Sequence, residues 1–195
     1  LPTLFMLVAI AAAIFLLVSK VIRARNETLC AVCQDYIGQI ALALENYKDV
    51  HGSYPPAYTV DANGKRMHSW RVLILPYLEE ERLYRTIRLD EPWDSPANQK
   101  VGYPTMQNYC CPFNSPSENT TVFAVHNNGK LGDCVQGGEE FLIIEVPDRP
   151  VNWMSPYGDV ECSELPEMRK RIKSMGHPGG IGKYDFERKF ERLVD

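Results

Sequence analysis

The first stretch of the chain is apolar on every side of a helix. Residues 1–19 carry no charged side chain. As a helix they are about 28 Å long, close to the hydrocarbon thickness of a bilayer. A buried helix of a soluble protein rarely stays apolar on every face for five turns. The pattern therefore predicts a membrane-spanning helix. The alternatives are a core helix and a retained secretory signal segment, which is usually shorter and ends at a small-residue cleavage site.

The pattern becomes amphipathic after residue 25. Apolar side chains recur there at spacings of three and four, which places them on one helix face. This predicted packing face consists of Leu29, Cys33, Tyr36, Ile37, Ile40, Leu44 and Tyr47, opposite the polar residues Gln34, Asp35, Gln39, Glu45 and Lys48. No proline interrupts the pattern, and Gly52 followed by Pro55 is typical of a helix end. We predict one continuous helix of about 48 residues, roughly 70 Å long.

Shorter elements follow the long helix. The predicted short helices are 68–78, 76–87 and 164–173; the predicted strands are 121–125 and 141–144, with weaker ones at 103–110 and 151–154. Asp61 to Gly64 predicts a turn, and residues 127–138 a loop. This order predicts an α+β fold, in which the long N-terminal helix packs its amphipathic half on a small antiparallel sheet. We divide the chain into a transmembrane helix with its basic flank, 1–25, and a head, 26–195, that includes the distal half of the long helix.

Charge is spread unevenly along the chain. Residues 26–166 contain 20 acidic and 10 basic side chains, whereas residues 167–195 contain 8 basic and 5 acidic ones. Lys20, Arg23 and Arg25 form a basic flank beside the apolar stretch. A net charge of −4 excludes binding of nucleic acid through overall charge. An acidic head between two basic ends is either a surface for contacts between copies or simply a solvated surface.

Several motifs in the head are shared with a known family. They are Cys33-x5-Gln39-Ile40-x-Leu42-Ala43-Leu44-x-Asn46-Tyr47, Asp49-x-His51-Gly52-x-Tyr54-Pro55-Pro56, His68-Ser69-Trp70-Arg71-Val72-Leu73-x-Leu75-Pro76-Tyr77-Leu78-Glu79, Leu89-Asp90-Glu91-Pro92-Trp93-Asp94-Ser95-Pro96-x-Asn98, Tyr109-x-Cys111-Pro112, Glu145-Val146, Trp153-Met154 and His177-Pro178-Gly179-Gly180. Over residues 33–180 the chain resembles the bacterial pilin-like family called domain of unknown function 1559, or the H-x9-DG family. A fainter similarity to the major pseudopilin of type II secretion lies in Tyr47-x6-Tyr54-Pro55 and Asp90-x-Pro92-Trp93.

This resemblance implies a type IV pilin-like fold, cleavage of a leader by a prepilin-type peptidase, and no enzymatic activity. The chain departs from the family pattern at two places. Pilins have an acidic residue five positions into the mature chain, where this chain has Phe5, and no acid occurs before Glu27. The Asp-Gly expected ten residues after His177 is replaced by Glu187 and Arg188. With that ending altered, residues 181–195 are predicted to form a charged helix.

The six cysteines are best explained as structural. Cys30 and Cys33 form a C-x-x-C pair, but the next residue is not histidine, which disfavours covalent haem. The pair lies inside a helix, which disfavours thioredoxin-like chemistry, and zinc would need two more ligands than the adjacent Cys110 and Cys111 readily supply. Disulfides on an extracytoplasmic head remain. Of the 15 connectivities that six cysteines allow, we favour the pairs Cys33–Cys111 and Cys134–Cys162.

The sequence shows no catalytic, cofactor or metal motif. His51 and His177 lie beside glycine or proline, which suggests roles in turns. No P-loop, nucleophile elbow or G-x-G-x-x-G occurs. The turn that begins at Asp61 faintly resembles a calcium loop but lacks the expected glutamate. We rank three interpretations of the basic run 169–173. A solvated helix face comes first, a membrane or partner contact second, and a nucleic-acid contact last.

These observations predict a non-enzymatic, single-span, membrane-anchored structural subunit of pilin or pseudopilin type, with no cofactor. The alternative is an accessory anchored subunit of a larger membrane complex that forms no filaments. The expected partners are membrane lipid and other protein subunits, but not nucleic acid. The expected location is the cytoplasmic membrane, with the head in the periplasm or outside. The cations Lys20, Arg23 and Arg25 would favour a cytoplasmic head, whereas the cysteines and the resemblance favour the outside.

Overall fold

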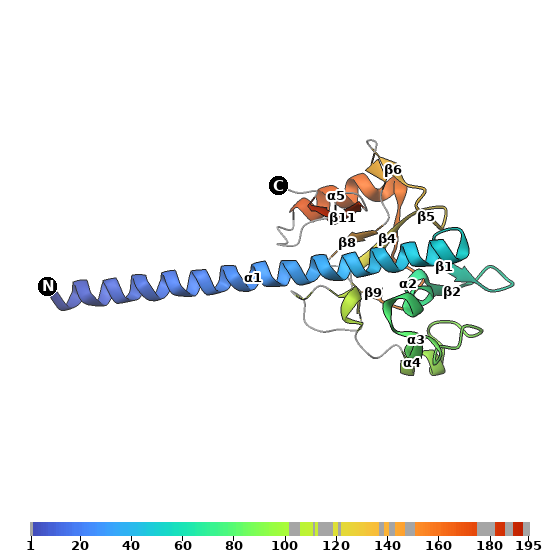
Figure 1. Cartoon of the computed structure of the whole chain (residues 1–195), viewed down its shortest axis with the longest axis horizontal. Helices are drawn as coiled ribbons and strands as arrows, with labels where there is room; N and C mark the ends of the chain where they lie inside the picture. Colours follow the sequence, from blue (N-terminus) through green and yellow to red (C-terminus); the bar gives the residue numbers. More distant parts are fainter. Residues whose placement is uncertain are drawn as a thin grey trace.

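One long helix forms the axis of the molecule. The computed structural model describes residues 2–101, 106–110, 112, 119–120, 122–136, 139–140, 143–146, 151–174, 182–185 and 189–192. Helix α1, Pro2–His51, runs for 50 residues, as predicted, and the rest of the protein gathers around its C-terminal half (Figure 1). At its end, Gly52 adopts a left-handed φ of 79°, and its N–H bonds to the carbonyl of Lys48 at 2.7 Å. Glycine takes this conformation at little cost, which explains why the helix stops there.

A lobe of short elements follows on one side of α1. Its elements are β1 Tyr58–Val60, β2 Arg66–Ser69, α2 Trp70–Leu73, the 3-10 helix η1 Leu75–Leu78, α3 Glu81–Tyr84 and α4 Pro96–Val101. The predicted turn after Asp61 joins β1 and β2, with Gly64 at a φ of 80°. The two helices predicted over 68–78 and 76–87 are replaced by three shorter ones. Ser69 belongs to β2 and caps α2, and Glu79 ends η1 with a left-handed φ of 63°.

The main sheet is built on β4, Val122–Asn127. Its partners are β5 Lys130–Leu131 and β8 Ile143–Glu145, both antiparallel, and β10 Val160–Glu161, which is parallel. Two small antiparallel pairs accompany it: β3 Asn119–Thr120 with β9 Val151–Asn152, and β6 Val135–Gln136 with β7 Glu139–Glu140. The predicted antiparallel sheet therefore includes one parallel pairing, and the predicted loop 127–138 contains β5 and β6. The N-terminal ends of the two predicted strands, Thr121 and residues 141–142, lie outside the described residues.

Strand β4 is buried on both faces and separates two apolar clusters. Val122 and Ala124 point into the larger cluster, with Ile40 and Leu44 of α1. Phe123 and Val125 point into the smaller one, which includes Leu165 at the start of helix α5, Leu165–Ser174. Side chains alternate between the two faces of a strand, so one strand contributes to both clusters. The head is thus layered as α1 and the short helices, then the sheet, then α5 (Figure 1).

Three further elements test the sequence predictions. Residues 106–110, part of a predicted weak strand, instead contain the 3-10 helix η2, Gln107–Tyr109. Another 3-10 helix, η3 Cys162–Glu164, leads into α5.

The predicted helix over 181–195 is wrong in the described part, where β11 Gly182–Asp185 pairs with β12 Lys189–Arg192 as an antiparallel hairpin. β11 contacts β8 and both strands contact α1, so pairing with existing structure overrides the local pattern. The α+β class is confirmed.

Candidate functional site

The apolar half of α1 lies outside the head. From Leu4 to Ile22 its large apolar side chains are between 49% and 71% exposed, on every side of the helix. Among the described residues, this is the one helix long and apolar enough to cross a membrane, and none of its most apolar 18-residue window is buried. An exposed apolar surface of this extent marks contact with lipid or with another protein.

Three cationic side chains follow the apolar half of α1. Lys20, Arg23 and Arg25 are all exposed. Residue 20 lies about 27 Å along the helix from residue 2, which matches one hydrocarbon thickness. Long cationic side chains can lie along apolar surface while their charged ends reach the headgroups. The flank therefore falls where phosphate groups would lie if the apolar half spans a bilayer.

The predicted packing face of α1 does meet the head. Cys33, Ile37, Ile40 and Leu44 are buried, and Leu29, Tyr36 and Tyr47 are half-buried. The buried face is wider than predicted because Ala41 and Ala43 are also fully buried. The opposite side keeps an apolar residue in solvent, since Leu42 is 52% exposed. The small side chains of Ala41 and Ala43, beside the predicted face, were the sequence signal that could have indicated this wider contact.

A buried arginine ties the lobe of short helices to the sheet. Arg71 is fully buried, and its Nη2 lies 2.8 Å from Oδ1 of Asp159. Its guanidinium also donates to the carbonyl of Val122 in β4 and to Oγ of Ser69. The same Asp159 oxygen accepts from the Trp70 indole and from the Ala124 N–H, at 3.2 and 2.9 Å. These hydrogen bonds offset part of the cost of burying both charges, since the other oxygen of Asp159, Oδ2, is buried without a partner among the described residues. Sequence reasoning missed this pair because 88 residues separate its members.

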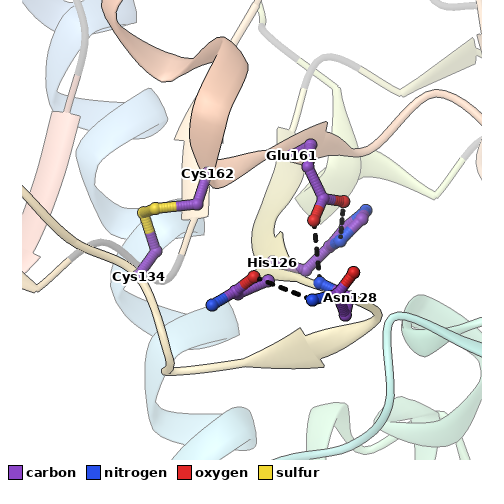
Figure 2. The surroundings of a disulfide bond; sticks show 6 residues. His126, Asn128, Cys134, Glu161 and Cys162 are labelled. Atoms are coloured by element: carbon purple, nitrogen blue, oxygen red, sulfur yellow. Dashed lines mark hydrogen bonds and ion pairs between the residues drawn. A yellow bond between two sulfur atoms is a disulfide. The ribbon is translucent and has the colours of Figure 1, made fainter.

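Two links hold residues 161 and 162, at the junction of β10 and η3, to the segment 126–134 that follows from β4 (Figure 2). The sulfurs of Cys134 and Cys162 are bonded at 2.07 Å, which is one of the two favoured pairs. Beside this bond, Glu161 places Oε2 at 2.8 Å from Nδ1 of His126 and accepts the Asn128 N–H on Oε1 at 2.7 Å. The N–H of Gly129 also points at Nδ1, at 3.2 Å. One nitrogen cannot donate and accept at once, and the shorter contact to a carboxylate assigns the proton to Nδ1.

A buried amide organises the loop between α3 and α4. Asn98 is fully buried, and its Nδ2 donates to the carbonyls of Arg88 and Pro92, each at 2.9 Å. Its Oδ1 accepts the N–H of Arg88 at 2.9 Å. Nearby, hydrogen bonds from Ser95 and then from Arg88 lower the pKa of the half-buried Glu91 carboxyl. One side chain thus satisfies backbone groups that the irregular loop leaves without ladder partners.

The other polar residues that the sequence singled out make structural hydrogen bonds or ring contacts. The Asp61 carboxylate accepts the N–H groups of Asn63 and Lys65, which makes the faint calcium loop a hydrogen-bonded turn. His51 stacks on Tyr47 and lies 3.2 Å from the hydroxyl of Tyr77. Burial, and then Tyr77, raise the pKa of Tyr47. His177 lies outside the described residues.

Among the described residues, His68 has the most buried side-chain atoms without a hydrogen-bond partner. It is 1% exposed, and neither ring nitrogen has a hydrogen-bond partner within the part of the chain that the structure describes. Burial lowers its pKa, and the carbonyls of Glu91, Leu89 and Arg88 oppose that shift. The net direction means that the neutral ring is favoured in the fold.

The described residues bring together no group of three or more His, Cys, Asp or Glu side chains that could hold a metal ion. Cys30 and Cys33 lie one turn apart on α1, with Cys33 buried and Cys30 half-buried. Cys110 follows η2, and Cys111 lies outside the described residues. What the geometry does offer is an uncovered apolar helix joined to a cross-linked head.

These features define a class of protein: an α+β head assembled on one half of a long helix whose other half is apolar and uncovered. The chain belongs to the family described as protein of unknown function, DUF1559, whose sequence model matches residues 25–148. The match begins at the last cation of the basic flank and extends through the amphipathic half of α1, the short helices and β4 to β8. Comparisons with curated proteins and with solved structures found no match. Family membership and the apolar helix are compatible with a membrane-anchored surface protein.

Proposed function

We propose that this protein is a single-span, non-enzymatic structural subunit of pilin or pseudopilin type. The observation that carries the proposal is the two-part helix α1, apolar and uncovered on all sides over residues 3–19 and packed into a head beyond residue 29. An anchor that continues without a break into the head holds the head at a fixed height above the membrane. That geometry suits lateral assembly of copies, with lipid and other protein subunits as partners.

We place the head outside the cytoplasmic membrane. The Cys134–Cys162 bond supports this placement, because disulfides persist in oxidising compartments and are rare in the cytosol. The cations Lys20, Arg23 and Arg25 count against it, since positive residues beside a span usually stay in the cytoplasm. We weigh the disulfide and the family resemblance more, because a bonded Cys134–Cys162 pair points to an oxidising compartment, whereas the cations only bias the orientation of the span.

A second candidate is an accessory subunit that remains in the bilayer as part of a larger complex. The apolar half of α1 favours it, because residues 3–19 contain no acidic side chain of the kind that the resemblance expects in this helix. Without a buried carboxylate to pair with a neighbour, the usual assembly contact of pilins is missing. The two candidates share the anchor and the orientation and differ only in what the head assembles with.

Two measurements test the proposal. Protease digestion of intact cells and of inverted membrane vesicles locates the head; we expect cleavage of the head only where the outer face of the membrane is accessible. Negative-stain electron microscopy of natively purified protein, with mass spectrometry of copurifying chains, then separates the two candidates. Helical filaments of this chain support the pilin reading, and discrete particles with other subunits support the accessory one. A head cleaved only in inverted vesicles would overturn both.

A further inference from the structure

Four aromatic side chains with polar atoms gather where α1 ends, at the far end of that helix from the N-terminus (Figure 1). Tyr47 and His51 lie one turn apart on α1, so they share a helix face. Tyr77 comes from η1, which contacts both α1 and α3, and Tyr84 is the last residue of α3. We call these four residues the tyrosine–histidine cluster. Three of them, Tyr47, His51 and Tyr77, belong to the motifs that the head shares with its family.

Ring contacts fix the positions of these three side chains. The ring of His51 stacks on that of Tyr47, with centroids 4.1 Å apart. The ring of Tyr77 meets both edge-on, with its centroid 5.8 Å from that of Tyr47 and 6.5 Å from that of His51. Nε2 of His51 lies 3.2 Å from the hydroxyl oxygen of Tyr77. The packing therefore brings one nitrogen and one oxygen with lone pairs together at the surface.

The cluster is open to solvent and free of competing cations from its neighbours in the chain. His51 is exposed, and the three tyrosines are half-buried. Lys48, which follows Tyr47, lies over the ring of Tyr54 at 4.3 Å from the centroid. Arg85, which follows Tyr84, forms an ion pair with Glu81. Both cations are thus engaged elsewhere, and a positively charged ligand can reach the cluster.

The phenols of the cluster resist ionisation together. Burial raises the pKa of Tyr47, and Tyr77 and then Tyr84 raise it further. Burial, then Glu81 and Tyr77, raise the pKa of Tyr84. Phenols repel one another in this way only as phenolates, so the three oxygens are close enough to interact electrostatically. Without a cation the cluster keeps its phenolic protons, whereas a cation of high charge among the oxygens would reverse the repulsion.

The ligand atoms select the kind of metal. Phenolate oxygens are hard ligands, and three of them balance the charge of a trivalent cation. Two metal–ligand bonds of about 2.1 Å at a right angle place their ligand atoms about 3.0 Å apart, which the separation of His51 and Tyr77 matches. Zinc and copper favour more nitrogen or sulfur than one imidazole supplies. In the oxidising compartment proposed for the head, aqueous iron is ferric.

We propose that the tyrosine–histidine cluster binds one Fe³⁺ ion through Nε2 of His51 and the phenolate oxygens of Tyr77, Tyr47 and Tyr84. Each phenol that binds gives its proton to solvent, and the iron stays ferric, so the step needs no oxidant or reductant. With three phenols and one histidine, the site is compatible with the lack of a cluster of His, Cys, Asp and Glu among the described residues. It goes beyond the proposed function, because neither an anchor nor an assembly role requires a metal.

An optical titration of the full chain in detergent tests the site. The purified protein is stripped of metal with a chelator, dialysed, and titrated with ferric nitrilotriacetate. Phenolate bound to Fe³⁺ gives a charge-transfer band in the visible range, where the protein alone does not absorb. We expect this band to saturate at one iron per chain. Because binding releases protons, the apparent affinity should rise as the pH rises.

Matched variants identify the ligands. Tyr77→Phe should remove most of the band, and Tyr47→Phe and Tyr84→Phe should each weaken it. His51→Gln should keep the colour, which comes from the tyrosines, but should weaken binding by at least about tenfold. The control is Tyr58→Phe, which changes a half-buried tyrosine of β1 outside the cluster and should titrate like the wild type.

Three results would overturn the site. They are no band in the wild type, a band that Tyr77→Phe leaves unchanged, and a band that never saturates, which would mark an adventitious ion only. Circular dichroism shows whether each variant keeps its helix. If Tyr77→Phe does not fold, the bands of Tyr47→Phe and Tyr84→Phe decide, and unchanged bands in both would overturn the site. Alkaline carbonate extraction and electron microscopy report on the anchor and on assembly independently of iron.

Discussion

The two halves of α1 have the same backbone and opposite environments. The first half exposes its apolar side chains on every face, and the second buries one face under the head and exposes the other. An apolar stripe about 100° wide is enough to dock a helix on a protein, whereas lipid contact requires apolar residues all round. One continuous helix can therefore suit two different surroundings when its residue pattern changes partway along.

The largest effect is expected from charges placed in the uncovered half. Ile10→Arg with Ile14→Arg puts two cations near the middle of the apolar stretch. Each costs about 2.5–3.5 kcal/mol at the centre of a membrane helix, so together they oppose insertion by about 5–7 kcal/mol. We expect the protein to leave the carbonate-resistant membrane fraction.

The matched control adds the same two charges to the covered half. Leu42→Arg with Val50→Arg changes side chains that are 52% and 68% exposed in the head. We expect membrane retention to stay as in the wild type. Equal retention of both double variants would show that the apolar half is not the anchor.

The next largest effect is expected at the buried ion pair of the head. Arg71→Met leaves the Asp159 carboxylate buried without its cation, which costs about 3–5 kcal/mol of unfolding free energy. Urea unfolding in detergent, followed by the fluorescence of the three tryptophans Trp70, Trp93 and Trp153, measures the loss. Arg85→Met, which breaks an exposed ion pair with Glu81, should cost no more than about 1 kcal/mol.

A companion variant separates the unpaired charge from lost packing. Arg71→Met combined with Asp159→Asn removes both charges, and we expect it to recover part of the stability lost in Arg71→Met. No recovery would mean that the arginine acts through its bonds to Val122 and Ser69 rather than through the charge of Asp159.

A moderate effect is expected from the two sides of the covered half. Leu44→Ala opens a cavity in the larger apolar cluster and should cost about 2–5 kcal/mol. Leu42→Ala removes an exposed side chain two residues away and should change stability by less than about 0.5 kcal/mol. Similar losses in the same urea experiment would show that both sides of α1 are covered in solution.

The smallest effect is a pH dependence that belongs to the head alone. Because the pKa of His68 is lowered in the fold, the unfolded chain binds more protons below its own pKa of about 6.5. The contribution of His68 to stability is therefore complete above that pH and declines as the pH falls, by at most about 1.4 kcal/mol per pH unit. The urea midpoint of the wild type should fall faster between pH 7 and pH 5 than that of His68→Gln. Parallel curves would exclude His68 as the cause.

Local patterns predicted the elements that depend on neighbouring residues. The run of apolar residues and the later three–four spacing gave α1 its length and its packing face, and Gly52 gave its end. The turn after Asp61 and helix α5 followed from similarly local signals. The prediction of a helix over residues 181–195 was wrong in the described part. Its mixed apolar and charged pattern does not specify a helix, and pairing between β11 and β12 forms a hairpin there instead.

The sequence by itself determined one long helix with an apolar half and an amphipathic half, an α+β head, and cysteines suited to disulfides. The tertiary structure decided that Arg71 meets Asp159, that His126 meets Glu161, and that β10 runs parallel to β4. The physical reason is distance along the chain. Helix periodicity is set by residues three and four apart, whereas these contacts join residues tens of positions apart and exist only once the core has closed.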